Sequence, residues 1–159
     1  MNLSTHFTLR ELAGTTHRSL QESNLSEASG YLPALRALCT GLLEPLRAHF
    51  GKPVVIHSGF RGPSLNRAVE GSRTSQHLTG QAVDFHVVGV PLRETWEWLG
   101  RDSGLKFGQL ILEGYVQGEP SWVHLSLGAP WRESSRCGEV MEAVVDPTTR
   151  KAAYRRVLL

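Results

Sequence analysis

The sequence predicts an α+β fold in which a small central antiparallel sheet is flanked by helices. Leucines recur at helical spacing through residues 32–50, and several later segments alternate apolar and polar residues as strands do. Glycine and proline separate these segments. The 159 residues are enough for one hydrophobic core. We therefore expect a single domain, with a core at about residues 3–128 and a C-terminal tail at residues 129–159.

The composition is typical of a globular protein and argues against a nucleic-acid partner. The chain is 40% hydrophobic and 20% charged, and its net charge is only +2. This charge is at most compatible with attraction to an anionic surface. No stretch approaches the roughly 20 apolar residues of a membrane-spanning helix. We expect a monomer that binds neither nucleic acid nor the membrane interior.

The N-terminal segment and the cysteines bear on the cellular compartment. Cys39 and Cys137 have the spacing of neither a zinc pair nor a redox motif, so we expect unpaired thiols in a protein made in a reducing compartment. The first residues lack the basic start and apolar run of a signal peptide. We therefore expect synthesis in the cytoplasm without such a signal.

The first third of the chain predicts helices. Thr8 is expected to cap a short helix at Leu9–Ala13, with Glu11 completing a capping box. The segment Gln21–Gly30 is polar and turn-like. Leu32–Phe50 is the clearest helix, and Pro45 should bend or split it. Its apolar stripe consists of Leu35, Leu38, Leu42, Leu43 and Leu46.

The middle of the chain alternates between strands and helices. We expect a buried strand at Val54–Ser58, a short helix at Pro63–Val69 and a helix at Pro91–Gly100. Gly80 permits a tight turn, and Gln81–Val88 after it reads as a strand. One face of that strand carries Val83, Phe85 and Val87. The opposite face carries Ala82, Asp84 and His86.

Two further strands, Gln109–Glu113 and Trp122–Leu127, are expected to pair as a hairpin around a loop at Gly114–Ser121. If their apolar residues share the buried face, parity places Gln109, Ile111 and Glu113 on the same side as His124. Beyond Gly128 the pattern weakens. We expect a short edge strand at Val140–Val145 and a basic, partly helical tail at Asp146–Leu159.

His77, Asp84 and His124 form the candidate metal site. His77 lies on the turn, and Asp84 and His124 both point away from the apolar faces of their strands. Imidazole and carboxylate groups suit zinc, and three protein ligands leave one position for water, as in catalytic zinc sites. Each histidine alone would more often be structural, and Asp84 could instead pair with Arg61. The joint occurrence of the three residues favours the metal site.

The pattern S-x-H-x-x-G-x-A-x-D at residues 75–84, followed by W-x-H at residues 122–124, resembles the M15 family of zinc peptidases. This is the group of D-Ala-D-Ala carboxypeptidases and L,D-endopeptidases, and the likeness is greatest to its short phage and prophage members. The phrases IHSGFRGPSLNRAVEGSRTSQH and FGQLILEG belong to the resemblance, which runs from about Leu3 to Leu127. It implies a hedgehog/DD-peptidase-like fold, Zn²⁺ as cofactor and peptidoglycan stem peptides as substrate.

The same resemblance implies roles for further residues. Arg61 would bind a substrate carboxylate through two parallel hydrogen bonds, although a surface salt bridge is the alternative. Ser75 would contact substrate or orient His77, unless it only stabilises a turn. Better-known members carry an acidic base three residues before the last histidine ligand, where this chain has Ser121. Two candidates for the base remain, Glu113 by strand parity and Glu119 on the Gly-Glu-Pro loop.

Three functions follow from these observations. The first is a zinc peptidase that cuts peptidoglycan, as a phage or prophage endolysin or a wall hydrolase; it would reach the wall after release during lysis or within a virion. The second, motivated by Ser121, is a non-catalytic zinc module that binds wall peptides or a protein. The third is a cytoplasmic dipeptidase that acts on free D-Ala-D-Ala.

Overall fold

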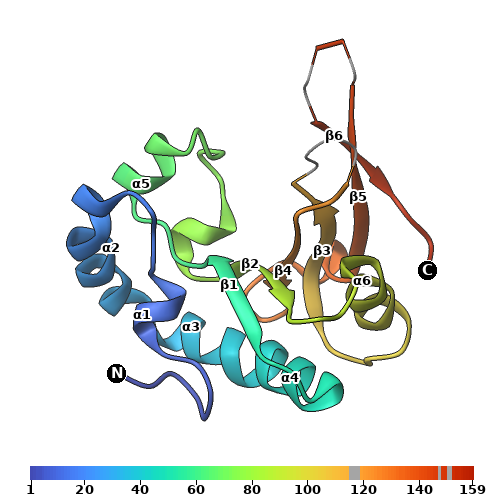
Figure 1. Ribbon diagram of the computed structural model, residues 1–159, viewed down its shortest axis with the longest axis horizontal. Helices are drawn as coiled ribbons and strands as arrows, with labels where there is room; N and C mark the ends of the chain where they lie inside the picture. Colours follow the sequence, from blue (N-terminus) through green and yellow to red (C-terminus); the bar gives the residue numbers. More distant parts are fainter. Residues whose placement is uncertain (115–118, 147, 150–151) are drawn as a thin grey trace.

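The computed structural model describes residues 1–114, 119–146, 148–149 and 152–159 and confirms the α+β fold (Figure 1). The strands in this part of the chain form one six-stranded sheet in the order β1-β2-β4-β3-β5-β6. They are β1 Val54–Ser58, β2 Ala82–Val87, β3 Phe107–Glu113, β4 Trp122–Leu127, β5 Glu139–Val145 and β6 Ala152–Arg156. The strands β1 to β4 pair antiparallel, whereas β5 joins β3 in parallel, so the complete sheet is mixed.

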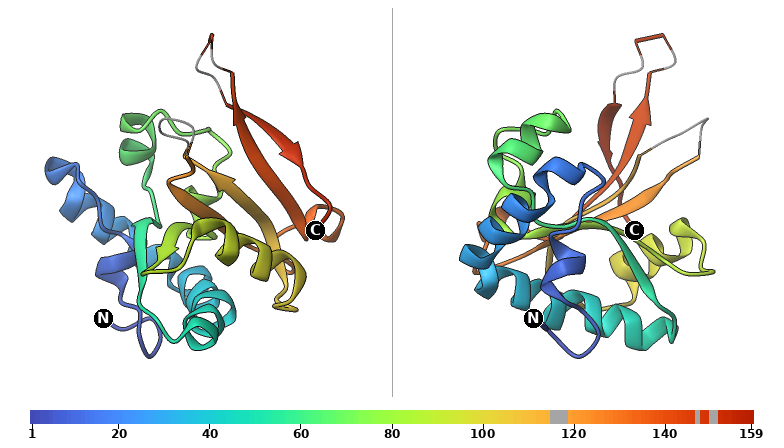
Figure 2. Two further views of the ribbon diagram at one scale, coloured as in Figure 1. Left: turned by 45° about the vertical axis from the view of Figure 1, so that its right-hand side comes forward. Right: turned by 60° about the vertical axis from the view of Figure 1, so that its left-hand side comes forward.

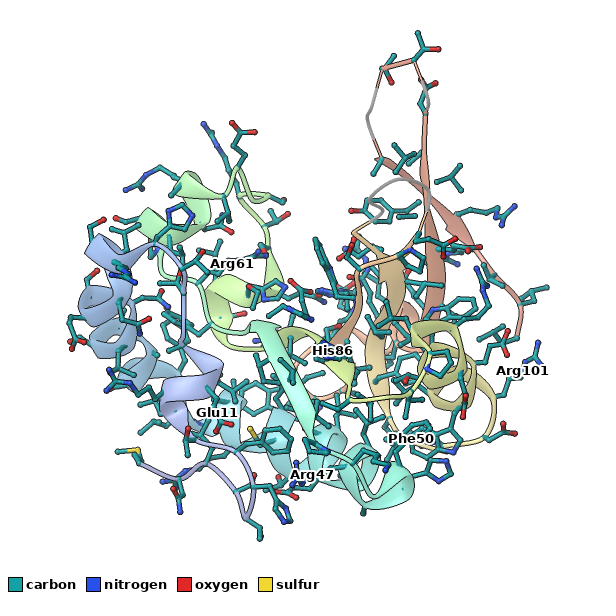
Figure 3. All side chains as sticks on the ribbon, in the orientation of Figure 1. Glu11, Arg47, Phe50, Arg61, His86 and Arg101 are labelled. Carbon is teal, nitrogen blue, oxygen red and sulfur yellow. The ribbon has the colours of Figure 1, made fainter. Side chains whose placement is uncertain are left out.

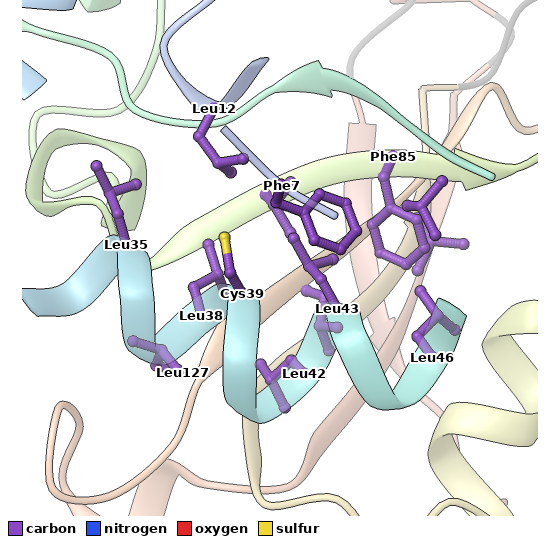
Figure 4. Packing of buried hydrophobic residues seen from close by; sticks show 14 of the residues in the cluster. Phe7, Leu12, Leu35, Leu38, Cys39, Leu42, Leu43, Leu46, Phe85 and Leu127 are labelled. Atoms are coloured by element: carbon purple, nitrogen blue, oxygen red, sulfur yellow. The ribbon is translucent and has the colours of Figure 1, made fainter. Parts of the chain in front are cut away.

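Most of the helices pack against one face of this sheet. The helices are α1 Leu9–Leu12, α2 Gln21–Ala28, α3 Leu32–Leu38, α4 Glu44–Phe50, α5 Pro63–Ala68 and α6 Leu92–Arg101. The exception is α5, which contributes no residue to the hydrophobic core cluster and lines a cavity beside Asp84 instead. Figure 4 shows the leucines of α3 and α4 packed against Phe85 of β2 and Leu127 of β4. Trp96 and Leu99 of α6 belong to the same core. The other face of β2 and β4 is thereby left for polar side chains.

The long helix contains a π-turn at the predicted point of disruption. Between α3 and α4, residues Cys39–Leu43 are π-helical, and the N–H of Glu44 bonds to the carbonyl of Cys39. Pro45 has no N–H for the regular ladder, and a π-turn absorbs such a defect without ending the helix. The π-helical residues separate α3 from α4, so the helix is split at this point, which is one of the two outcomes predicted for Pro45.

The N-terminal region differs from the prediction in one helix. The capping box between Thr8 and Glu11 is present as expected. The turn-like interpretation of Gln21–Gly30 is wrong, because α2 occupies most of this segment. Buried Asn24 attaches α2 by donating to the carbonyls of Ala13 and Phe60 at 2.9 and 3.1 Å. Because a polar side chain holds this helix, its sequence shows no apolar periodicity from which a helix could be predicted.

The C-terminal tail also differs from the prediction. Residues 152–156 form strand β6, not a helix, and β5 lies inside the sheet because β6 flanks it. Figure 2 shows β5 and β6 side by side at one edge of the sheet. Basic residues of β6 pair with acidic residues of β5, with Arg155 Nη2 3.0 Å from Glu142 Oε2.

The hairpin of β3 and β4 has the predicted register, with Leu110 opposite Leu125 and Ile111 opposite His124. Part of its predicted loop, residues 115–118, lies outside the described residues. None of the helices that the structure describes has the length and hydropathy needed to cross a bilayer.

Candidate metal centre

Three elements bring His77, Asp84 and His124 together. His77 lies in a 3₁₀ turn, Gln76–Thr79, and its backbone N–H donates to the side chain of Ser75, the residue that caps this turn. Gly80 ends this turn with a φ of 67°, a backbone conformation that would be strained in a residue with a side chain. Asp84 and His124 are direct partners in the pairing of β2 with β4. The turn therefore sets His77 over a carboxylate and an imidazole that the sheet register already holds side by side.

The ligating atoms of the three side chains converge, and all lie within 4.8 Å of one another. His124 Nδ1 is 2.8 Å from Asp84 Oδ1. His77 Nε2 is 3.3 Å from the same carboxylate oxygen and 3.3 Å from His124 Nδ1. All three side chains are buried. Two imidazole nitrogens and one carboxylate oxygen form a donor set that could bind a metal ion.

Neighbouring groups orient both imidazoles. His77 Nδ1 lies 2.7 Å from the carbonyl oxygen of Gly59. When Nδ1–H donates to this oxygen, the lone pair of Nε2 is free for the cluster. His124 Nε2 lies 3.4 Å from Gln76 Oε1, which favours a free lone pair on Nδ1. Outer hydrogen bonds of this kind fix the tautomer and orientation of metal-binding histidines. Gln76 is a site residue to which sequence reasoning gave no role, although it lies inside the motif.

Burial and mutual contact set the charges of the cluster. Burial alone would raise the pKa of Asp84, but His77 and His124 lower it well below its ordinary value. Burial lowers the pKa of His77 despite the adjacent Asp84 carboxylate. The cluster therefore holds an ionised carboxylate beside a neutral His77 imidazole at neutral pH, and these are the forms that bind metals.

The cluster opens into a cleft of about 670 Å³. Arg61, labelled in Figure 3, reaches it from the loop between β1 and α5. Arg61 Nη2 donates to Ser75 Oγ at 3.3 Å. The buried Asp84 carboxylate contacts the two imidazoles, which is the arrangement expected of a ligand set and not of a simple Asp84–Arg61 pair.

The two candidate bases occupy different environments. Glu113 lines the cleft, and its Oε1 is 3.9 Å from His124 Nδ1. Trp122 Nε1 donates to Glu113 Oε1 at 3.4 Å, and the Tyr154 hydroxyl donates to Oε2 at 3.0 Å. Glu119 is exposed and is absent from the described lining of the cleft. The geometry therefore favours Glu113 for a role in proton transfer.

The C-terminal strands contribute a wall that sequence reasoning missed. Tyr154 of β6 and Met141 of β5 line the cleft, together with Arg132 and Arg136 from the segment before β5. Although the residue as a whole is exposed, partial burial against the cleft, and then the charge of Glu113, raises the pKa of Tyr154 to about 12, so its hydroxyl stays protonated and can donate. From the sequence we expected only a basic, partly helical tail here, because the sequence of the tail shows no alternation that points to the site.

Comparison with known families agrees with this geometry. The family model described as Peptidase M15 matches residues 5–126. No curated protein matches the chain significantly. The matched region contains the three residues of the metal cluster, Arg61 and Glu113, and it stops before β5 and β6. Since the match covers most of the sequence, the chain belongs to the peptidase M15 family.

Proposed function

We propose that this protein is a zinc-dependent peptidase that hydrolyses peptidoglycan stem peptides, as a carboxypeptidase or an endopeptidase. The convergence of His77, Asp84 and His124 in a cleft that also holds Arg61 and Glu113 carries this proposal. Membership of the peptidase M15 family supports the peptidase activity. The role that we propose in the cell is that of a phage or prophage endolysin, which reaches the wall during lysis or within a virion.

The donor set fits zinc better than a harder cation. Imidazole nitrogen is a preferred ligand of zinc, whereas magnesium and calcium prefer oxygen. His77, Asp84 and His124 would hold the ion. Zinc bound there supplies a Lewis acid for the scissile carbonyl and a bound water of lowered pKa.

Glu113 would act as the general base and then as the general acid. Its Oε1 faces the cluster, while its Oε2 is held by the hydroxyl of Tyr154. We propose that Oε1 accepts the proton of the attacking water and passes it to the nitrogen of the leaving amine. A side chain fixed in this way can transfer protons without first reorganising.

Arg61 would anchor a carboxylate of the substrate. Its Nε is buried and has no hydrogen-bond partner among the described residues, although its Nη2 is held by Ser75. The guanidinium has five N–H donors, so those that Ser75 does not engage can bind a carboxylate through two parallel hydrogen bonds. A stem peptide offers such a carboxylate at its terminus, so this contact would align the scissile bond with Glu113.

Wall digestion with and without zinc tests the proposal. Purified protein with zinc is incubated with isolated peptidoglycan, and newly formed amino groups are measured. We expect amino groups to appear, and we expect a chelator or His77→Ala to abolish their formation. Hydrolysis that continues under both conditions would contradict the proposal.

Two further outcomes identify the competing functions. Binding of zinc and wall without any release of amino groups would indicate a non-catalytic module. Rapid hydrolysis of free D-Ala-D-Ala together with inert peptidoglycan would indicate a dipeptidase.

A further inference from the structure

A second pair of imidazoles lies beside the candidate metal centre. His57 of β1 and His86 of β2 place His57 Nε2 2.7 Å from His86 Nδ1, with their rings tilted by 31° (His86 is labelled in Figure 3). Neither residue belongs to the cluster of His77, Asp84 and His124. The two nitrogens thus face each other across adjacent strands.

A β-bulge creates this contact. Ile56 pairs with Phe85 and Ser58 pairs with Asp84, so His57 is the extra residue between these two pairs. Regular pairing would set His57 opposite Asp84. Bulges redirect side chains and are frequent next to functional sites. Here the bulge lets the imidazole of His57 meet that of His86.

The distance between the nitrogens suits a shared metal ion. With metal–nitrogen bonds of about 2.0–2.1 Å, two imidazole nitrogens on one ion are roughly 2.9–3.4 Å apart. The observed 2.7 Å requires them to separate by well under 1 Å. His57 is exposed and His86 is partly exposed, so the rings can adjust and water can fill the other coordination positions.

The charge state of His57 also suits a metal ligand. Partial burial, followed by the proximity of His86, lowers the pKa of His57, whereas the charge of Asp84 raises it by less. The imidazole of His57 is therefore neutral at neutral pH, and this is the form that binds a divalent ion.

We propose that His57 and His86 form a second metal site, open to solvent, that binds a transition-metal ion such as Zn²⁺, Ni²⁺ or Cu²⁺ through His57 Nε2 and His86 Nδ1. Imidazole ligands suit these three ions, and Cu²⁺ binds most strongly among divalent first-row metals. With two protein ligands, this site is weaker than the cluster of three. It borders a cavity lined by His57, Arg61 and Asp84, so it lies next to the cleft without being part of the cluster.

Calorimetric titration of the metal-free chain with zinc chloride tests this proposal. The wild type should show a tight site and a weaker one. His57→Ala and His86→Ala should each weaken the second site by more than about tenfold, since loss of even an outer partner of a metal ligand costs 10–100-fold. Both variants should retain the tight site. His49→Ala is the matched control, because His49 stacks on Trp98 away from the pair and should leave both sites intact.

His77→Ala separates this proposal from the proposed function, because it should remove the tight site and leave the weaker one. A wild type without a second site would overturn the proposal, as would a second site that survives both His57→Ala and His86→Ala. Electron paramagnetic resonance of bound copper gives an independent check. Cu²⁺ added to His77→Ala, whose cluster keeps a single histidine, should show two imidazole nitrogens, and copper without two such nitrogens would contradict the site.

Discussion

A substitution of Glu113 can distinguish the loss of proton transfer from the loss of metal binding. Its carboxylate lies 3.9 Å from His124 Nδ1 but is outside the ligand cluster. We predict that Glu113→Gln lowers kcat by about 10²–10⁴-fold, the usual contribution of a general base. Zinc content should be unchanged, because the amide preserves the shape of the side chain. Steady-state kinetics and metal analysis of the same preparation measure both effects.

Glu119→Gln is the matched control for this substitution. It makes the same chemical change on an exposed side chain that the sequence offered as an alternative base. Its kcat should equal that of the wild type. Full activity in Glu113→Gln combined with a large loss in Glu119→Gln would assign the base to the loop instead.

At the scale of elements, β6 supplies a group that orients the proposed base. The hydroxyl of Tyr154 donates to Glu113 Oε2 at 3.0 Å. A hydrogen bond to a charged group contributes about 1.5–3 kcal/mol. Because Tyr154 is exposed, the lower end of this range applies, so Tyr154→Phe should reduce kcat by roughly tenfold, less than the loss in Glu113→Gln. Tyr31→Phe removes a hydroxyl from a residue whose ring packs at a tilt against Phe60, and it should not change kcat. Equal rates for both variants would exclude a role for β6 in positioning Glu113.

The N-terminal segment is attached to α4 through Glu44, and this contact should depend on pH. Ser4 Oγ and the His6 backbone N–H donate to Glu44 Oε1 at 2.7 and 2.8 Å. Burial would raise the pKa of Glu44, but the hydrogen bonds from His6 and Ser4 lower it below its ordinary value of 4.5. Because the folded pKa lies below the unfolded one, the stabilisation is present above about pH 4.5 and is lost as the pH falls through the folded pKa.

We therefore predict that Glu44→Gln destabilises the protein at neutral pH and that the difference from the wild type shrinks in acid. Urea unfolding of both proteins at neutral pH and near pH 3 measures this difference. A gap that widens towards acid would show that the carboxylate is not stabilised by these hydrogen bonds.

Elements that bury one regular face could be predicted from the sequence, whereas elements without such a face could not. Alternation identified β2 because Val83 and Phe85 enter the core while Asp84 faces the cleft. The helix α2 escaped notice because it is held by the amide of buried Asn24 instead of an apolar stripe. Strand β6 escaped because every residue in it is exposed, which gives the sequence no period of two.

At the scale of the whole molecule, the ligand cluster could be predicted and the wall around it could not. His77 and Asp84 belong to one short motif, and the antiparallel pairing of β2 with β4 places His124 beside Asp84. Tyr154 reaches the cleft only through the parallel pairing of β3 with β5 and the return of β6. Such long-range parallel pairing leaves no local signal. The wall also lies beyond the region matched by the family.

The account depends most on a single metal ion held by residues from the turn, β2 and β4. Anomalous diffraction at the zinc absorption edge, from crystals loaded with equimolar zinc, tests this directly. The strongest peak should lie about 2.0–2.2 Å from His77 Nε2, His124 Nδ1 and an oxygen of Asp84. A protein that takes up no zinc, or a strongest peak away from these three side chains, would contradict the account.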